Sequence, residues 1–323
     1  MHRQRINQTL NPIEQRINRL IPPALENPLP PQAKKGLHEA ALRYGASSAQ
    51  ASLFSAEGRI TLDAITVTMV CLRSEPVPFW LLIGYLPPPQ ALHLAVWHHA
   101  LLRSNEVSMA MNGSSFGIDQ AGNAILTKPL LFNSPEDIDE LATCLNDFNT
   151  LASSLIDLLL SLKAPEVHAS PVPTASEQTG EAIQLAQKQM HKTWHNPLMV
   201  QLCEELGPAA RLSVLHDFLC VIDLPERQIT LIGDGDERHL LVATPVHQRF
   251  SEEKMHVGLL RANSELMPLS HCAFSLSSAG ISLLSRQNSD GQSSAELASW
   301  LADFVTLATA CDLPPPAAPT NTR

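Results

Sequence analysis

The chain has 323 residues and a formal net charge of −10, from 32 acidic and 22 basic residues. At roughly 150 residues per domain, this length predicts about two domains, each long enough to bury a core of its own. A hydrophobic content of 44% excludes a wholly disordered chain, and the excess of acidic residues argues against sequence-independent binding of nucleic acid over most of the chain.

Residues 1–33 form a predicted basic arm. Six basic and two acidic residues fall within residues 1–36. The arm either contacts phosphate or a membrane surface or is a short solvated or self-docking segment, and the second interpretation is favoured. Polar residues interrupt any apolar core, so a secretory signal is not expected. No window of 18 uninterrupted apolar residues occurs, so we expect no membrane span.

A first domain is predicted over residues 34–163. Its expected elements are a helix at 37–47, strands at 59–62, 65–72 and 79–85, a middle helix ending in the Leu-Leu-Arg motif at 101–103, two short strands around Phe116 and Gly122, and a last helix opened by the capping pattern Ser134-Pro135-Glu136-Asp137. Short strands joined by tight turns indicate a mainly antiparallel sheet with helices against it, which is an α+β domain.

A Pro/Ser/Thr linker at 164–190 separates this domain from a second one at 191–312, and a Pro-rich disordered tail is expected at 313–323. The expected elements of the second domain are a helix from the cap at Asn196-Pro197 to Gly207-Pro208, strands at 213–222, 228–232 and 239–246, a hairpin turn at 233–236, a middle helix, two short strands, and a last helix capped by Ser293 and Glu296.

The two predicted domains are related by an internal repeat. Leu101-Leu102-Arg103-Ser104-Asn105 recurs 158 residues later as Leu259-Leu260-Arg261-Ala262-Asn263. The segment 146–152 recurs at 302–308, at a shift of 156 residues. Matches in the same order at nearly constant spacing predict two tandem copies of an α-β-β-β-α-β-β-α domain.

One motif has the pattern of an enzyme. Gly113-Ser114-Ser115-Phe116-Gly117 fits G-x-S-x-G, in which a nucleophilic serine lies between a strand and a helix. Here the flanking segments 107–111 and 124–126 both look like strands, and the repeat places Ala273 at the position of Ser115. We therefore expect a strand turn and no enzyme, and keep a Ser115 hydrolase as a remote alternative.

No metal or cofactor is expected. His191 and His195 are four residues apart but have no third ligand nearby in the sequence, and the chain has no P-loop or dinucleotide-binding glycine motif. The cysteines lack paired spacing, which indicates reduced, buried thiols in a cytoplasm. They are Cys71, Cys144, Cys203, Cys220, Cys272 and Cys311.

The repeated segments resemble the class I chaperones of bacterial type III secretion. The likeness lies in the Leu-Leu-x-x-Asn motif of the middle helix, in the strand turn from Phe116 to Gly122 and its copy from Phe274 to Gly280, and in the long apolar last helices. It covers about 37–162 and 197–312. The resemblance implies a non-enzymatic cytoplasmic protein that holds the amino-terminal segment of a secreted effector in extended form and helps deliver it to the export apparatus.

Two tandem copies depart from the single domain of that family. They imply an intramolecular pseudo-dimer, which we favour, or a larger assembly. The family's pairing through the middle helix predicts a seam between the halves at Trp97, Leu101, Val257 and Leu260. A chaperone-fold regulator or adaptor that binds a folded secretion-system component is the alternative function.

An extended client needs apolar pockets for its side chains and an exposed sheet edge for its backbone. We predict that the pockets lie on the first helix and first strands of each half, although each position is also a candidate for ordinary core. The predicted effector-binding residues are Leu37, Ala41, Ile65, Val67, Met69, Leu198, Leu202, Leu219 and Val221. Because the halves have diverged, their two surfaces are expected to differ.

Overall fold

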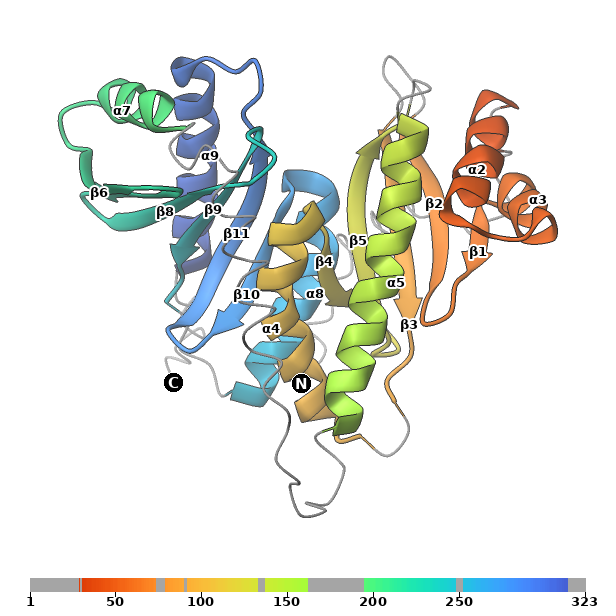
Figure 1. Ribbon diagram of the computed structural model, residues 1–323. Coiled ribbons are helices and arrows are strands. Elements are labelled where there is room, and N and C mark those ends of the chain that lie inside the picture. The colour runs from red at the N-terminus through yellow and green to blue at the C-terminus, as the bar shows by residue number, and fades with distance from the viewer. Residues whose placement is uncertain are drawn as a thin grey trace, which may run out of the picture. The chain divides into compact units, whose positions relative to one another are not determined.

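The computed structural model describes residues 29, 31–73, 79–89, 92–132, 137–161, 195–247 and 252–312 (Figure 1). The predicted linker, the tail, most of the basic arm and the cap at Ser134 lie outside the described residues. In these ranges the chain forms seven helices and two antiparallel sheets of five and six strands. The predicted α+β class is therefore confirmed.

The chain divides into two compact units. Unit 1 contains the chain up to Asp157 together with the segment His256–His271, and unit 2 contains Leu158–Met255 and the chain from Cys272 onward. The segment from the second half that belongs to unit 1 is most of helix α8 (Glu252–Ser270). The core of unit 1 therefore includes a helix from the second sequence repeat.

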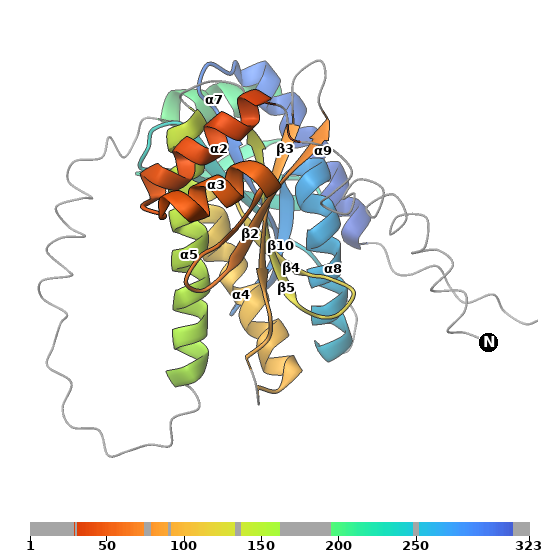
Figure 2. The same cartoon turned by 90° about the vertical axis from the view of Figure 1, so that its right-hand side faces the viewer.

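Unit 1 contains a five-stranded sheet, sheet A, with strand order β1-β2-β3-β5-β4. Its strands are β1 (Arg59–Thr61), β2 (Thr66–Arg73), β3 (Phe79–Leu86), β4 (Ser115–Ile118) and β5 (Ala124–Leu131). Its helices, besides α8, are α2 (Pro31–Tyr44), α3 (Ser48–Glu57), α4 (Leu94–Asn112) and the greater part of α5 (Asp137–Ser161). Helices α2 and α3 pack on each other (Figure 2), and α3 packs on β1.

Unit 2 contains a six-stranded sheet, sheet B, with strand order β10-β11-β9-β8-β7-β6. Its strands are β6 (Arg211–His216), β7 (Leu219–Leu224), β8 (Arg227–Gly233), β9 (His239–Pro245), β10 (Cys272–Ser277) and β11 (Gly280–Asn288). Its helices are α7 (Asn196–Glu205) and α9 (Ser294–Asp312), which pack on each other.

The two sheets share one topology. Without β6, sheet B reads β7-β8-β9-β11-β10, the same order as β1-β2-β3-β5-β4 in sheet A, and every neighbouring pair is antiparallel. In chain order, both repeats have a helix between the third and fourth of these common strands, and another after the fifth. The repeat found in the sequence is therefore matched by a repeat of the fold.

The two copies differ in the segment that precedes their first common strand in the sequence. There, each copy has an element that the predicted order lacks. Unit 1 has the additional helix α3, which starts at a capping box formed by Ser47 and Gln50 and ends at Gly58, whose φ is 67°. Unit 2 has the additional strand β6 at this place. The prediction of one strand over 213–222 is wrong, because the chain turns back at Asp217, whose φ is 47°, a left-handed conformation that aspartate tolerates.

The middle helices are longer than predicted. Helix α4 does not end at its Leu-Leu-Arg motif but continues to Asn112, where Gly113 with a φ of 74° ends it. Leu101 and Leu102 are fully buried, so the motif marks the packed middle of the helix. The segment 107–111, predicted as a strand, is the last part of this helix.

The predicted caps of unit 2 have mixed outcomes. The capping box that opens α9 is confirmed: the amide of Glu296 donates to Ser293 Oγ, and that of Ser293 donates to the Glu296 carboxylate. The predicted Asn196 cap is wrong by one residue, since His195 is the N-cap of α7 and makes no side-chain capping hydrogen bond. Pro197 still lies in the first turn, where a missing N–H costs nothing.

Candidate functional site

Ser115 does not lie in a nucleophile elbow. It is the first residue of β4 and follows helix α4, whereas the elbow requires a serine that follows a strand and precedes a helix. The side chain is 1% exposed, and its Oγ has no hydrogen-bond partner among the described residues. A serine nucleophile needs an adjacent base within hydrogen-bond reach. The geometry around Ser115 therefore lends the hydrolase interpretation no support.

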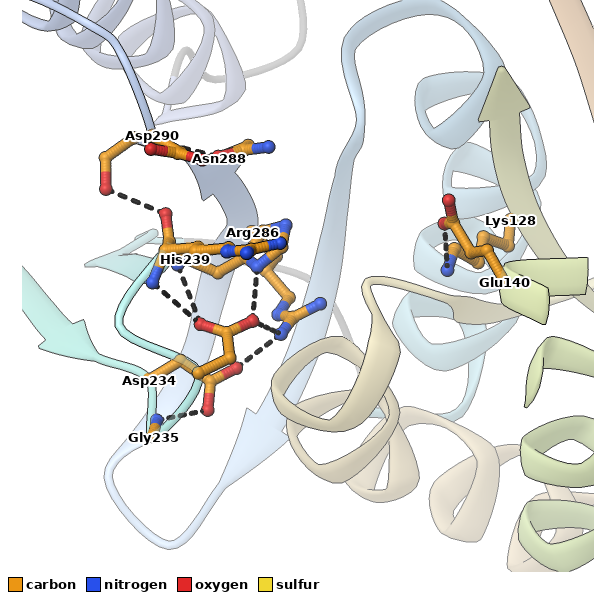
Figure 3. Close-up of polar contacts among 11 residues, drawn as sticks. Lys128, Glu140, Asp234, Gly235, His239, Arg286, Asn288 and Asp290 are labelled. Carbon is orange, nitrogen blue, oxygen red and sulfur yellow. Dashed lines mark hydrogen bonds and ion pairs between the residues drawn. The ribbon is translucent and has the colours of Figure 1, made fainter. Parts of the chain in front are cut away.

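The polar cluster at the β8–β9 hairpin has a structural role, because it joins the hairpin loop to β11. Arg286 of β11 forms ion pairs with Asp234 and Asp236 in the hairpin loop, and Asp236 also accepts from the amides of Arg238 and His239 (Figure 3). The His239 ring lies 2.5 Å from Asp236. Arg286 supplies the positive charge between these carboxylates. In the part of the chain that the structure describes, no three His, Cys, Asp or Glu side chains are grouped to hold a metal ion.

We expect Asp236→Asn to lower the free energy of unfolding by about 1 kcal/mol at pH 7. This value allows for solvent screening of the carboxylate, which is partly exposed. Partial burial acts to raise the pKa of Asp236, but the hydrogen bonds from Arg238 and His239 outweigh it and hold the pKa below its ordinary value. A carboxylate with a lowered pKa stabilises the fold above the unfolded-state pKa, and this contribution is lost as the pH falls below about 4.

Urea denaturation of wild type and of Asp236→Asn between pH 7 and about pH 3 measures this effect. Asp303→Asn, at an exposed position, is the control. The difference between wild type and Asp236→Asn should shrink as the pH falls, while Asp303→Asn stays close to wild type throughout. A difference that grows at low pH would contradict the assignment.

The first-half residues predicted to bind an effector are part of the core. Leu37, Ala41 and Val67 are fully buried, Ile65 is 2% exposed and Met69 is 3% exposed. Met69 and Val67 lie in β2 on the face of sheet A that α5 covers, because a Cβ on Gly84, the partner of Val67, would meet Phe148 of α5 at 3.1 Å. These five side chains form no exposed surface in unit 1.

The second-half predictions divide between the core and the surface. Leu202 of α7 is fully buried and Leu198 is partly exposed. Leu219 and Val221 of β7 are both partly exposed. Cys220, which lies between them, and Ile222, which follows Val221, are fully buried. Because side chains alternate along a strand, Leu219 and Val221 share the face of sheet B opposite its buried face.

This second face of sheet B is the candidate functional site, and we call it the open face. The strand registers align Val214 with Val221, and Leu219 with Ile232 and Leu241, so these side chains form a continuous apolar surface. Val214 is 39% exposed and the other four are partly exposed. The buried face is formed by the alternate residues of the same strands, and it lies against α7, which contacts β6 and β7 and itself packs on α9. Those residues are Cys220, Ile222, Ile229, Leu231, Leu240 and Val242.

Ile232 and Leu241 belong to the open face but were not among the predicted residues. Their strands were predicted, and alternation alone would have grouped Ile232 with Thr230 and Leu241 with Ala243. Apolar residues occupy both faces of these strands, so periodicity does not reveal which face the helices cover.

The predicted seam residues lie on helices α4 and α8, in the parts of both helices that belong to unit 1. Trp97, Leu101 and Leu260 are fully buried and Val257 is partly exposed. A Cβ on Gly117 of β4 would come within 2.8 Å of the Leu260 carbonyl oxygen. The rings of His99 and His256 meet edge to face at 5.4 Å.

The repeated asparagines of the two middle helices meet at one peptide group. Asn105 Nδ2 of α4 donates to the Phe116 carbonyl at 3.0 Å, and Asn263 Nδ2 of α8 donates to the same oxygen at 3.1 Å. The Phe116 amide donates back to Asn105 Oδ1 at 2.6 Å. Both asparagines are fully buried. The Leu-Leu-x-x-Asn motif therefore serves packing in both copies.

Comparisons with known proteins do not identify the chain. No protein-family model matches the sequence, and no curated protein matches it either. Within the described ranges, no helix has the length and apolar character needed to cross a bilayer. Any assignment of function therefore depends on the fold and the open face themselves.

Proposed function

We propose that the protein is a non-enzymatic chaperone that holds an extended segment of a secreted protein on the open face of sheet B. The observation that carries the proposal is the continuous apolar surface of Val214, Leu219, Val221, Ile232 and Leu241, next to the outermost strand of a sheet. Exposed apolar surface of this kind indicates a binding site, and a sheet edge supplies hydrogen bonds to an extended backbone.

The resemblance to class I type III secretion chaperones supports the same function. The motifs that carry it are packing motifs, and the strand order repeated in the two sheets supports a duplicated domain. In this proposal the client is the amino-terminal segment of an effector, kept ready for the export apparatus in a bacterial cytoplasm. The net charge of −10 argues against nucleic acid as the partner.

The tandem repeat is proposed to replace a homodimer by an intramolecular pseudo-dimer. In favour of this, α8 of the second repeat belongs to the compact unit of the first repeat and shares the Phe116 carbonyl with α4. A single-domain relative would need a second chain to supply that helix. The expected functional unit is therefore one chain with two unequal halves.

Lysine on the open face is expected to prevent client binding. Val214→Lys combined with Val221→Lys places two charges where apolar contact is required, and a loss of about 1.4 kcal/mol already weakens binding tenfold. The measurement is co-elution in gel filtration with the co-expressed amino-terminal segment, about 100 residues, of a secreted effector. We expect the complex with wild type and its loss with the double variant.

Leu53→Lys is the matched control, since Leu53 is a comparably exposed apolar residue, 48% accessible, on helix α3 of unit 1. This variant should retain the complex. A complex that survives the double substitution would contradict the open face as the binding site. Binding of a folded secretion component, with indifference to the unfolded segment, would replace the chaperone by the adaptor.

A further inference from the structure

Lys128 is a largely buried lysine whose ammonium group contacts both a cysteine and a glutamate. It lies in β5 opposite Leu82 of β3, and its side chain is 13% exposed. Its Nζ lies 3.2 Å from Glu140 Oε1 (Figure 3) and 3.1 Å from Cys144 Sγ, and both partners belong to helix α5. An amine, a thiol and a carboxylate therefore meet where α5 covers sheet A.

The fold does not require a lysine at this place, because the second copy has a different residue there. When the two sheets are aligned on the repeated phenylalanines of β4 and β10, the strand registers place the buried Ser285 at the position of Lys128. The shift of 156 residues between the last helices places Trp300 at the position of Cys144. The contact between an amine and a thiol therefore belongs to unit 1 and has no counterpart at these positions of unit 2.

The three groups are arranged for a bond between sulfur and nitrogen once the sulfur is oxidised. Peroxide converts a cysteine thiolate to a sulfenic acid, which condenses with a nearby nitrogen to a sulfenamide. Lys128 Nζ is in direct contact with the sulfur, and the Glu140 carboxylate accepts a hydrogen bond from the ammonium group that must lose a proton before it attacks. Glu140 is exposed, so a small oxidant reaches the cluster from its side.

In the resting state the sulfur is a thiol beside an ammonium ion. Burial raises the pKa of the Cys144 thiol, and the neighbouring Lys128 acts against this effect. Burial acts to lower the pKa of Lys128, but its contacts with Cys144 and Glu140 outweigh burial and raise it. Because the thiolate is the species that peroxide oxidises, the reaction is slow, and the pair is stable until an oxidant is supplied.

We infer that hydrogen peroxide cross-links Cys144 to Lys128 through a sulfur–nitrogen bond that ties α5 to β5. Peroxide transfers one oxygen atom to the sulfur and leaves as water, which gives the sulfenic acid. The Lys128 nitrogen then bonds to the sulfur, the sulfur–oxygen bond breaks, and a second water molecule leaves. Sulfur loses two electrons, peroxide gains them, and one proton of the ammonium group passes through Glu140 to solvent.

Peptide mapping by mass spectrometry, after treatment of the folded full chain with hydrogen peroxide, tests the cross-link. Trypsin releases both residues in the single peptide 104–163, because Lys128 precedes a proline, and Cys144 is the one cysteine of this peptide. We expect the peptide to lose two hydrogen atoms, which no disulfide within it can explain. Fragmentation separates this change from oxygen added to methionines, and dithiothreitol should reverse it.

Lys128→Arg is the matched control, since it keeps the positive charge but carries a guanidinium, which is a poor nucleophile. In this variant Cys144 should gain oxygen, and the peptide should lose no hydrogen. Glu140→Gln, at an exposed position, should slow the cross-link at least tenfold, while dimedone still traps the sulfenic acid. Wild type unfolded in urea, where the two groups are separated, should behave like Lys128→Arg.

Three results would overturn the inference. In folded wild type, Cys144 gains oxygen without loss of hydrogen, or it stays unmodified while the partly exposed Cys71, Cys203 and Cys311 are oxidised. Loss of two hydrogen atoms that persists in Lys128→Arg would assign the new bond to a backbone nitrogen. None of these results bears on binding of an effector segment, so the cross-link and the proposed function are tested separately.

Discussion

Gly117→Ala is expected to destabilise the protein by about 3 kcal/mol, at the upper end of what overpacking costs. Gly117 lies in β4 directly under helix α8. An added Cβ would come within 2.8 Å of the Leu260 carbonyl oxygen and within 2.9 Å of the Ser264 amide nitrogen. Both are backbone atoms of a helix, so no side-chain rotation relieves the clash. The helix must move away from β4, and the hydrogen bond from Ser264 Oγ to the Ile118 carbonyl is weakened with it.

Gly258→Ala is the matched control on the same helix. Nothing lies within 4 Å of a Cβ at Gly258, and its φ requires no glycine. Alanine is the better helix former, so this substitution should stabilise the protein by up to about 1 kcal/mol. Urea denaturation followed by circular dichroism measures both variants. A Gly117→Ala protein as stable as wild type would show that α8 does not pack on β4 as described.

The repeat was the most informative sequence signal for the fold. Packed residues such as Leu101 and Asn105 keep their identity in the second copy, because close-packed interiors tolerate few changes. The shared strand order follows from that repeat. It does not extend to α3 and β6, where the copies diverged and each segment had to be judged alone. For that reason, the apolar segments on both sides of the two-residue turn at Asp217 were predicted as one strand.

The open face was predicted only in part, for a different physical reason. Leu219 and Val221 were chosen as apolar residues of an early strand, and Met69 and Val67 were chosen on the same grounds. The structure places Leu219 and Val221 on the face of sheet B that is turned away from α7. It places Met69 and Val67 on the face of sheet A that α5 covers. Identical residue types fill both surfaces, and the face that a helix covers depends on tertiary packing that local patterns do not encode.

Asn105→Ala is expected to cost about 3 kcal/mol of unfolding free energy. The side chain exchanges two hydrogen bonds with the Phe116 peptide, and alanine would leave the buried Phe116 amide without its acceptor. Each buried hydrogen bond contributes about 1 kcal/mol, and an unsatisfied buried donor adds a penalty of about 1–3 kcal/mol. Asn146→Ala, at an exposed position of α5, should change stability by less than about 0.5 kcal/mol.

A double-mutant cycle with Asn263→Ala tests whether both middle helices stabilise the same peptide group. The Phe116 carbonyl keeps one donor after either single substitution and loses both in the double variant. The double variant should therefore lose more stability than the two single losses together, by at least about 0.5 kcal/mol, as residues sharing one partner are coupled. Strict additivity would mean that α4 and α8 stabilise the protein independently, which would remove the main support for an intramolecular pseudo-dimer.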